Sequence, residues 1–267
     1  MKPVITLLTD FGARDYFVGA MKGVILSINP RATIVDLTHE IPPQDIHAAA
    51  FNLLACYKDF PAGTIHLAVV DPGVGSNRRP ILVETGDQFF IGPNNGLFSW
   101  IIDREREFTA WQIANEQLFR KPVSSTFHGR DVFAPVAGAL SIGVPPESCG
   151  AAFLDLVALE RLTPRQTENG FEGSVIHIDR FGNCITNFTA EHIDEERIAA
   201  GAKLIVNDKE VSSIRKFFAD QSGPKNELFM LVGSAGFVEI ASQNASAAAI
   251  LSAKRGDAVL LVHDHRA

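Results

Sequence analysis

Hydrophobic and polar residues follow one another along the first half of the chain in blocks that predict alternating strands and helices. Apolar runs at residues 4–9, 33–37 and 64–70 have the length and composition of buried strands. Between them, residues 16–28 and 46–57 repeat apolar positions at helical spacing. This order is typical of a parallel sheet with crossover helices.

Further short elements follow before the midpoint of the chain. Apolar runs at 81–84 and 89–91, joined through a Gly-Asp pair, predict a hairpin added to the sheet. Residues 97–102 and 131–142 are expected to form short helices. We therefore expect an α/β N-terminal domain with a central, mostly parallel sheet over residues 1–164.

The second half has a different pattern, in which short strand-like runs alternate with turns. The polar, turn-rich segment 164–173 predicts a linker. The runs beyond it favour a smaller C-terminal antiparallel β-barrel domain over residues 165–267. These runs are residues 174–179, 203–206, 228–232, 237–240 and 258–263.

Composition and charge exclude several classes of function. A net charge of −7 over 267 residues disfavours general nucleic-acid or anionic-membrane binding, since both need a basic face. Three scattered cysteines argue against a disulfide framework and a structural zinc site. No signal peptide and no apolar run long enough to span a bilayer is seen, so we expect a cytoplasmic protein. Phosphate-binding glycine loops and serine-hydrolase or zinc-protease motifs are absent from the sequence as well.

Acidic residues follow two of the predicted parallel strands. Asp10 and Asp71 should emerge at the same edge of the sheet, where ligands of α/β proteins bind. Such carboxylates bind ribose hydroxyls or a metal ion, but they also stabilise surface turns, and the pattern leaves these alternatives open. Asp15 is the expected N-cap of the helix that begins at residue 16. Two arginines, Arg78 and Arg79, close the turn that follows Asp71.

Other positions could carry chemistry or could be structural. His128 precedes a predicted helix and could act near neutral pH as a base or a hydrogen-bond donor, or simply satisfy a neighbour. Asp179 and Asn183 flank a glycine turn, and Ser234 lies in another turn between strands. Phe218 is a core residue or a stacking surface. The tail at residues 263–265 could chelate a metal, although a frayed end explains it better.

Taken together, these stretches resemble the S-adenosyl-L-methionine (SAM) hydroxide adenosyltransferase family, the adenosine-forming SAM hydrolases related to fluorinases and chlorinases. The resemblance runs in order from Leu8 to about Ala247. The matching motifs are Thr9-Asp10-Phe11-Gly12 with Asp15, Val70-Asp71-Pro72-Gly73-Val74-Gly75 with Arg78, Gly92-Pro93-Asn94-Asn95-Gly96, Thr126-Phe127-His128-Gly129-Arg130-Asp131, Asp179-x-Phe181-Gly182-Asn183 with Thr186-Asn187, and Ser234-x-Gly236.

The resemblance implies hydrolysis of SAM to adenosine and L-methionine by attack of water on the ribose C5′, without a metal or cofactor. It implies a homotrimer with substrate sites between neighbouring subunits. It assigns the handling of the attacking water to Asp71, Arg78 and His128. The family's Asp-to-Arg spacing favours Arg78 over Arg79. The resemblance assigns the ribose to Asp10 and the methionine and adenine contacts to Asp179, Asn183, Ser234 and, more loosely, Asp15 and Phe218.

Three other functions compete with SAM hydrolysis. The halogenating relatives have Tyr at the position of Asp71, Ser at that of Gly129 and, in fluorinases, Arg at that of Ala235. A carboxylate at residue 71 would repel a halide ion but accept hydrogen bonds from water, so Asp71 favours hydrolysis. The remaining alternatives are a non-catalytic protein that binds an adenosyl ligand and a metal-dependent hydrolase built on Asp10 and Asp71, with or without His128.

Overall fold

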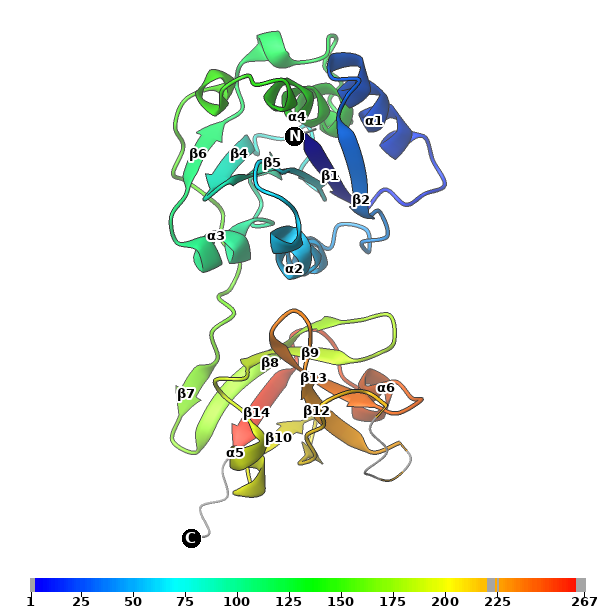
Figure 1. Ribbon diagram of the computed structural model, residues 1–267, viewed down its shortest axis with the longest axis vertical. Coiled ribbons are helices and arrows are strands. Elements are labelled where there is room, and N and C mark those ends of the chain that lie inside the picture. The colour runs from blue at the N-terminus through cyan, green and yellow to red at the C-terminus, as the bar shows by residue number, and fades with distance from the viewer. Residues whose placement is uncertain (1–2, 220–223, 225, 263–267) are drawn as a thin grey trace. The chain divides into compact units, whose positions relative to one another are not determined.

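The computed structural model describes residues 3–219, 224 and 226–262, and the chain divides into two compact units. The units are Met1–Arg161 and Leu162–Ala267, drawn in blue to green and in green to red in Figure 1. Each has a sheet and a hydrophobic core of its own. Residues 263–265, considered above as a metal-chelating tail, lie outside the described residues.

The first unit is built on a six-stranded sheet with the order β2-β1-β3-β5-β4-β6. The first four strands in this order pair in parallel, and β4 and β6 add antiparallel pairs at one edge. The apolar runs at 4–9 and 64–70 are buried on both faces, as crossover helices require, whereas the run at 33–37, in the edge strand, is only partly buried. The strands are β1 (Val4–Thr9), β2 (Thr33–Thr38), β3 (Ile65–Val69), β4 (Pro80–Thr85), β5 (Gln88–Pro93) and β6 (Thr109–Gln112).

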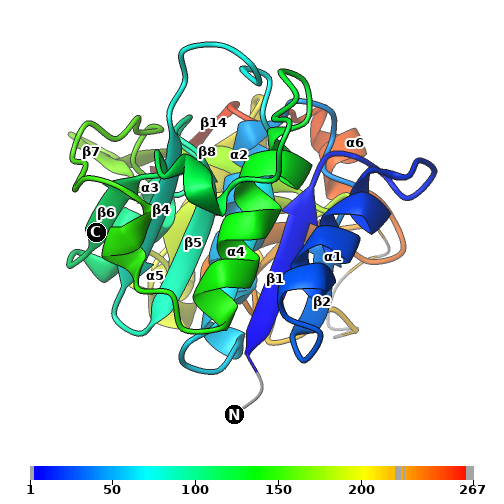
Figure 2. The same ribbon diagram turned by 90° about the horizontal axis from the view of Figure 1, so that it is seen from above.

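Helices cover both faces of this sheet. Figures 1 and 2 show α1 and α4 on one face and α2 with α3 on the other. The helices are α1 (Phe17–Ile28), α2 (Ile46–Cys56), α3 (Ser99–Glu105) and α4 (Ala134–Ser141). Short 3₁₀ turns occur at η1 (Tyr57–Asp59), η2 (Glu116–Leu118) and η4 (Pro146–Cys149), and one π-helical turn, η3 (Gly129–Phe133), precedes α4.

The prediction that Asp15 caps α1 is wrong. The cap position is occupied by Tyr16, in helical conformation and without a side-chain cap hydrogen bond, so Asp15 lies one residue before it. The chain is already helical at Tyr16, and the Asp15 side chain therefore precedes the position from which a cap reaches the free amide groups. By contrast, Asp45 caps α2 by accepting a hydrogen bond from the Ala48 amide.

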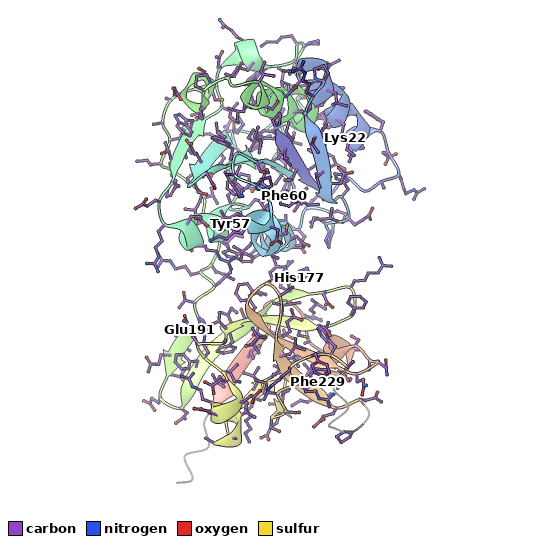
Figure 3. All side chains as sticks on the ribbon, viewed as in Figure 1. Lys22, Tyr57, Phe60, His177, Glu191 and Phe229 are labelled. Atoms are coloured by element: carbon purple, nitrogen blue, oxygen red, sulfur yellow. The ribbon has the colours of Figure 1, made fainter. Side chains whose placement is uncertain are left out.

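A neutral histidine is buried in the sheet of the first unit. His66 on β3 is fully buried, accepts at Nδ1 from the Thr6 hydroxyl at 2.8 Å and meets Gln88 Oε1 with Nε2 at 3.2 Å. The Gln88 amide nitrogen donates to the carbonyls of Tyr57 and Phe60, labelled in Figure 3, so its oxygen must accept from His66. Burial lowers the pKa of His66 to about 4.

This low pKa predicts a specific loss of stability in acid. Folding favours the neutral form of the His66 ring. Its contribution to the free energy of unfolding is therefore fully present above the unfolded pKa of about 6.5, and it is lost as pH falls toward the folded pKa of about 4. The loss should amount to about 3 kcal/mol. Urea unfolding of the wild type and of His66→Phe at several pH values would test it. If the two pH dependences are equal, His66 does not carry this effect.

The second unit is a curved antiparallel sheet with the order β11-β10-β14-β8-β9-β13-β12, and β7 pairs with β8. Backbone hydrogen bonds join Met230 on β12 to Ser213 and Arg215, just beyond β11, and bring the two ends of the sheet together. The strands are β7 (Arg165–Thr167), β8 (Gly170–Ile178), β9 (Cys184–Thr189), β10 (Lys203–Val206), β11 (Lys209–Val211), β12 (Leu228–Val232), β13 (Phe237–Ser242) and β14 (Ala258–Val262), with short helices α5 (Glu195–Ala199) and α6 (Ala247–Leu251).

The predicted fold class is confirmed: a mostly parallel α/β sheet is followed by an antiparallel, nearly closed barrel. The predicted linker is wrong over most of its length. Residues 165–167 and 170–178 form the hairpin β7-β8, in which β7 is short and largely exposed, while β8 pairs with β14, β9 and β7 and is half-buried over residues 170–174. A short exposed strand is indistinguishable from a linker in sequence, because edge strands carry charged residues too.

Candidate active site

Two candidate carboxylates lie at one edge of the first sheet. β1 and β3 are adjacent parallel strands, and Thr9 pairs with Val69 at their carboxyl ends. Asp10 and Asp71 directly follow these ends, at the edge where α/β proteins bind ligands, as their strand positions predict.

The Asp71 side chain forms a buried, two-point ion pair with Arg78. Arg78 Nε donates to Asp71 Oδ1 at 2.9 Å, and Arg78 Nη2 donates to Asp71 Oδ2. The two side chains are 5% and 10% exposed. A tight turn brings the arginine back to the acid, since the Val74 amide bonds to the Asp71 carbonyl and the Ser76 hydroxyl to the Gly73 carbonyl. A fork-shaped guanidinium fixes the orientation of the carboxylate.

The neighbouring arginine points elsewhere. The guanidinium of Arg79 lies over the ring of Phe153, 4.9 Å from its centre. Of the two arginines that the sequence could not separate by chemistry, Arg78 is therefore the one beside Asp71.

His128 is the third member of this group. Its Nδ1 lies 2.8 Å from Arg78 Nη2, although the two residues are fifty positions apart in the chain. Burial and the Arg78 charge lower the pKa of His128 below its usual value, and Asp71 and Asp131 act in the opposite direction. Arg78 can only donate, so Nδ1 accepts, and the neutral ring carries its proton on Nε2.

A second acid, Asp131, holds the segment that leads to His128. Its side chain is fully buried and accepts hydrogen bonds from Arg130 at 2.7 Å and Arg120 at 3.1 Å, and from the Ser124 amide at 2.9 Å. Burial acts to raise the pKa of Asp131, but these hydrogen bonds outweigh it and the pKa lies below its usual value. His128 directly precedes the π-helical turn η3, a distortion that is common at functional sites.

The remaining candidates of the first unit differ in their surroundings. Asp10 accepts a hydrogen bond at Oδ2 from the Gln44 amide at 2.8 Å. Gln44 has a positive φ of 67°, a strained conformation that turns its amide toward the acid. Asp15 is exposed, in the segment between Asp10 and α1.

In the second unit, Asp179 and Asn183 form one hydrogen-bonded turn. Asp179 Oδ1 accepts from the amides of Phe181 and Asn183, and Oδ2 accepts from the Asn183 side chain at 2.8 Å. Asn183 is nearly buried beside a cavity of about 540 Å³, which Phe218 also lines. The other lining residues are Phe181, Ser242, Asn244, Ala245 and Ser246.

This cavity suits a planar, polar ring. Phe181 and Phe218 expose large aromatic surfaces, 79% and 48% of their area, while amide and hydroxyl groups supply hydrogen bonds. Sequence reasoning missed Phe181 and Asn244 as lining residues. The signal available for Phe181 was its place in the glycine turn, where an exposed aromatic residue has no packing role.

Ser234 is not among the residues that line this cavity; it is exposed in the turn between β12 and β13. The carboxylate of Glu239 lies beneath that turn, where Gly233 has no side chain to block it. Burial and the charge of Asp179 raise the pKa of Glu239. The carboxyl groups of Asp179 and Glu239 therefore lie close enough to interact, and protonation of Glu239 is easier than for a free glutamate.

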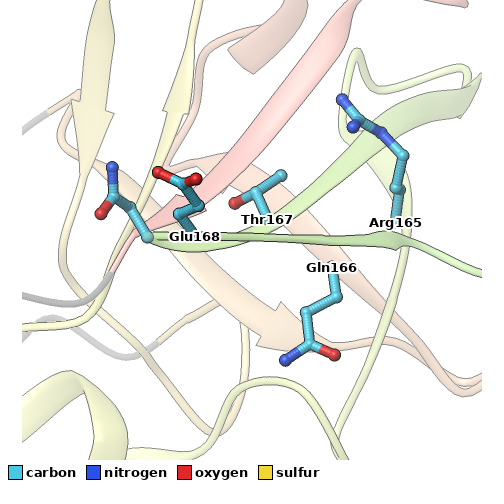
Figure 4. Close-up of a pocket in the computed structure, with 5 residues that line it drawn as sticks. Arg165, Gln166, Thr167 and Glu168 are labelled. Atoms are coloured by element: carbon cyan, nitrogen blue, oxygen red, sulfur yellow. The ribbon is translucent and has the colours of Figure 1, made fainter.

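The hollow beside β7 offers no comparable arrangement. In this hollow, Gln166 points to the side of the strand opposite Arg165 and Glu168, so the side chains do not converge (Figure 4). Across the residues that the structure describes, no three His, Cys, Asp or Glu side chains are grouped so as to hold a metal ion. Within the same residues, no helix is long and apolar enough to cross a membrane.

Known proteins resemble the chain over nearly its whole length. The model of the SAM hydroxide adenosyltransferase N-terminal domain matches residues 5–150, and that of the C-terminal domain matches residues 173–260. An "(R)-S-adenosyl-L-methionine hydrolase" from Thermus thermophilus is 38% identical over 98% of this chain and 100% of its own. One from Methanocaldococcus jannaschii is 35% identical over 97% and 96%.

A more distant relative and a solved structure also resemble the chain over nearly its whole length. A fluorinase from Nocardia brasiliensis is 26% identical over 97% of this chain and 96% of its own. The crystal structure of an uncharacterised conserved protein from Thermotoga maritima superposes with a TM-score of 0.88 at 37% identity, covering 96% of this chain and 99% of that one. The two domain models together account for both units, and the chain belongs to the SAM hydroxide adenosyltransferase family.

Proposed function

We propose that the protein hydrolyses SAM to adenosine and L-methionine by attack of water on the ribose C5′. Membership of the family and the names of relatives at 35–38% identity support this activity. The observation that carries the mechanism is the buried contact of Asp71, Arg78 and His128 at the ligand-binding edge of the sheet.

The chemistry requires little help at the leaving group. The C5′–O bond forms as the C5′–S bond breaks, and the bonding pair leaves with sulfur as a neutral thioether. The sulfonium charge disappears and the water releases one proton, so the protein must orient the water and accept that proton. Holding the water in line with the C5′–S bond supplies several kcal/mol.

The hydrogen bonds of the site support one assignment of the proton acceptor. His128 has Nδ1 occupied by Arg78, so its Nε2–H donates to the water oxygen and cannot accept. Asp71 keeps free lone pairs on both oxygens beyond those that bind Arg78. We therefore assign Asp71 as the proton acceptor and His128 as the donor that orients the water, with Arg78 holding both side chains in place.

The remaining predicted site residues are each assigned to one part of the substrate. We assign the ribose hydroxyls to Asp10, and the adenine ring to Asn183 and Phe218 beside the 540 Å³ cavity. The methionine part would meet Asp179 and Ser234, with Asp15 as a weaker candidate. The negative charge of Asp179 suits a substrate that carries an ammonium and a sulfonium group.

Product analysis from SAM in isotopically labelled water is the direct test. We expect equimolar adenosine and methionine, with solvent oxygen at C5′, both with EDTA and without it. Halide-dependent formation of a halogenated nucleoside would identify a halogenase instead. Tight SAM binding without turnover would identify a binding protein, and activity lost on chelation and restored by a divalent ion would identify a metal-dependent hydrolase.

Substitution of Asp10 separates binding from chemistry. Asp10→Ala removes the proposed ribose contact, and we expect the dissociation constants of SAM and adenosine both to rise about tenfold, as for a lost hydrogen bond to a charged group. Titration calorimetry with each ligand measures this. Asp59→Ala, a substitution of an acid in η1, is the matched control. Unchanged adenosine affinity in Asp10→Ala would remove Asp10 from the ribose site.

We further expect a cytoplasmic homotrimer with substrate sites at the subunit boundaries. The mass of one chain is 29.0 kDa, so sedimentation equilibrium distinguishes a trimer from a monomer or a dimer. A monomeric protein with full activity would contradict shared sites.

A further inference from the structure

We propose that Gly75 is a positioning residue, whose missing side chain lets the turn that carries Arg78 dock against Ser125 and so sets the contact between Arg78 and His128. The expected effect on turnover rests on the proposed function. The effect on the geometry of His128 does not.

The contact between Gly75 and Ser125 leaves no room for a side chain. Gly75 has a φ of +77°, and a Cβ built on it would lie 2.3 Å from the Ser125 carbonyl oxygen and 3.3 Å from its carbon. Ordinary contacts begin at 3.4 Å, so any other residue must move the two segments apart by about 1 Å. The obstacle is backbone, which cannot rotate away as a side-chain end would.

Both segments are internally tied, so the displacement would reach the site. The turn from Asp71 to Arg78 is closed by Ser76, whose hydroxyl bonds to the Gly73 carbonyl at 2.7 Å and accepts from the Arg78 amide at 3.2 Å. On the other side, the Ser124 amide is held by the buried carboxylate of Asp131 at 2.9 Å.

The hydrogen bond between Arg78 and His128, which links the two segments, breaks if its length increases by about 1 Å. Arg78 Nη2 and His128 Nδ1 are 2.8 Å apart, and a further 1 Å would take them beyond hydrogen-bonding distance. The neutral ring of His128 would then be free to rotate or to change tautomer. Because that ring orients the water in the proposed mechanism, we expect turnover to fall while substrate binding persists.

Gly63 offers a matched control. It has a similar φ of +79° at the opposite end of β3, but a Cβ there would meet no atom within 4 Å. Gly63→Ala and Gly75→Ala therefore impose the same left-handed strain, and they differ in the clash with the Ser125 carbonyl. Gly75→Asn and Gly63→Asn form a second pair, since asparagine tolerates this conformation and preserves the fold if alanine does not.

Steady-state kinetics on these variants is the first measurement. We expect kcat of Gly75→Ala and Gly75→Asn to fall tenfold or more with KM within about threefold, as for a misplacement of about 1 Å. The Gly63 variants should keep both constants near the wild-type values. A rise in KM at unchanged kcat would mean that Gly75 makes room for substrate, and Gly75 variants that behave like the Gly63 variants would also overturn the proposal.

Nuclear magnetic resonance of labelled histidine is the second measurement and needs no activity. Arg78 and Asp71 face His128 across the contact, and Asp131 lies on the segment that His128 begins. Separation of the segments weakens burial and the Arg78 charge, which together lower the pKa of His128, so its titration should move to higher pH in the Gly75 variants. An unchanged titration would overturn the proposal. If wild type fails to release adenosine while the titration moves, the proposed function fails and the positioning role stands.

Discussion

Replacement of Asp71 with asparagine is expected to reduce kcat for adenosine formation by about a hundredfold or more, with KM for SAM changed much less. Asparagine keeps the shape of the side chain but cannot accept the proton of the attacking water, and general bases contribute on this scale. Initial rates at saturating SAM, followed by chromatography of adenosine, measure the effect.

The same substitution should destabilise the fold, because it leaves the buried Arg78 guanidinium without its counter-ion. Loss of one partner of such a pair costs about 3–5 kcal/mol. Rates must therefore be measured well below the melting temperature of the variant. Asp103→Asn, on the exposed surface of α3, removes one negative charge elsewhere and should change neither property. A folded Asp71→Asn protein with near wild-type kcat would exclude Asp71 as the proton acceptor.

His128→Ala is expected to reduce kcat by about a hundredfold, whereas His128→Gln should retain activity to within about tenfold of wild type. A glutamine amide can place an N–H donor near the position of Nε2, but it has no basicity. If His128 orients the water as a donor, glutamine can partly replace it. If His128 accepts the proton, glutamine should be as poor as alanine, and that outcome would reverse the roles of Asp71 and His128.

The pH dependence of kcat in the wild type and in His128→Gln is a second test of the role of His128. Protonation of His128 at Nδ1 would break the bond from Arg78, so the wild-type rate should fall in acid. Because burial and Arg78 lower the pKa of His128, this fall should lie below the usual histidine pKa near 6.5, and the rate should stay level through neutral pH. The acid limb assigned to His128 should be missing in His128→Gln. An unchanged acid limb in that variant would assign it to another group.

The succession of strands and helices in the first half of the chain was predictable because buried parallel strands are continuous apolar runs. The same apolar runs predicted that Asp10 and Asp71 lie at one edge of the sheet, since each acid follows a parallel strand. In the structure these two strands, β1 and β3, lie side by side. Local chemistry also predicted the glycine turns at residues 73 and 182. The hairpin β7-β8 was misread as a linker because β7 is short and exposed and β8 begins with polar residues and glycines, so the segment lacks the apolar run on which the prediction depends.

The choice of side-chain partners could not be predicted in this way. Nothing local separates Arg78 from Arg79; one reaches Asp71 and the other lies over Phe153 because the turn directs consecutive side chains to different sides. The buried pairing of Asp131 with Arg120 and Arg130 was invisible for the same reason.

From sequence alone, the chain determined its two-part architecture, the sheet edge that carries the acids, and its family, because periodicity and turn chemistry are local properties. The tertiary structure alone decided which arginine meets Asp71, which nitrogen of His128 carries the proton, and how closely Gly75 approaches Ser125. The contacts of His128 and Gly75 join segments fifty residues apart, and the choice of arginine depends on how the turn directs its side chains. Packing sets these distances to within an ångström, and no local pattern encodes them.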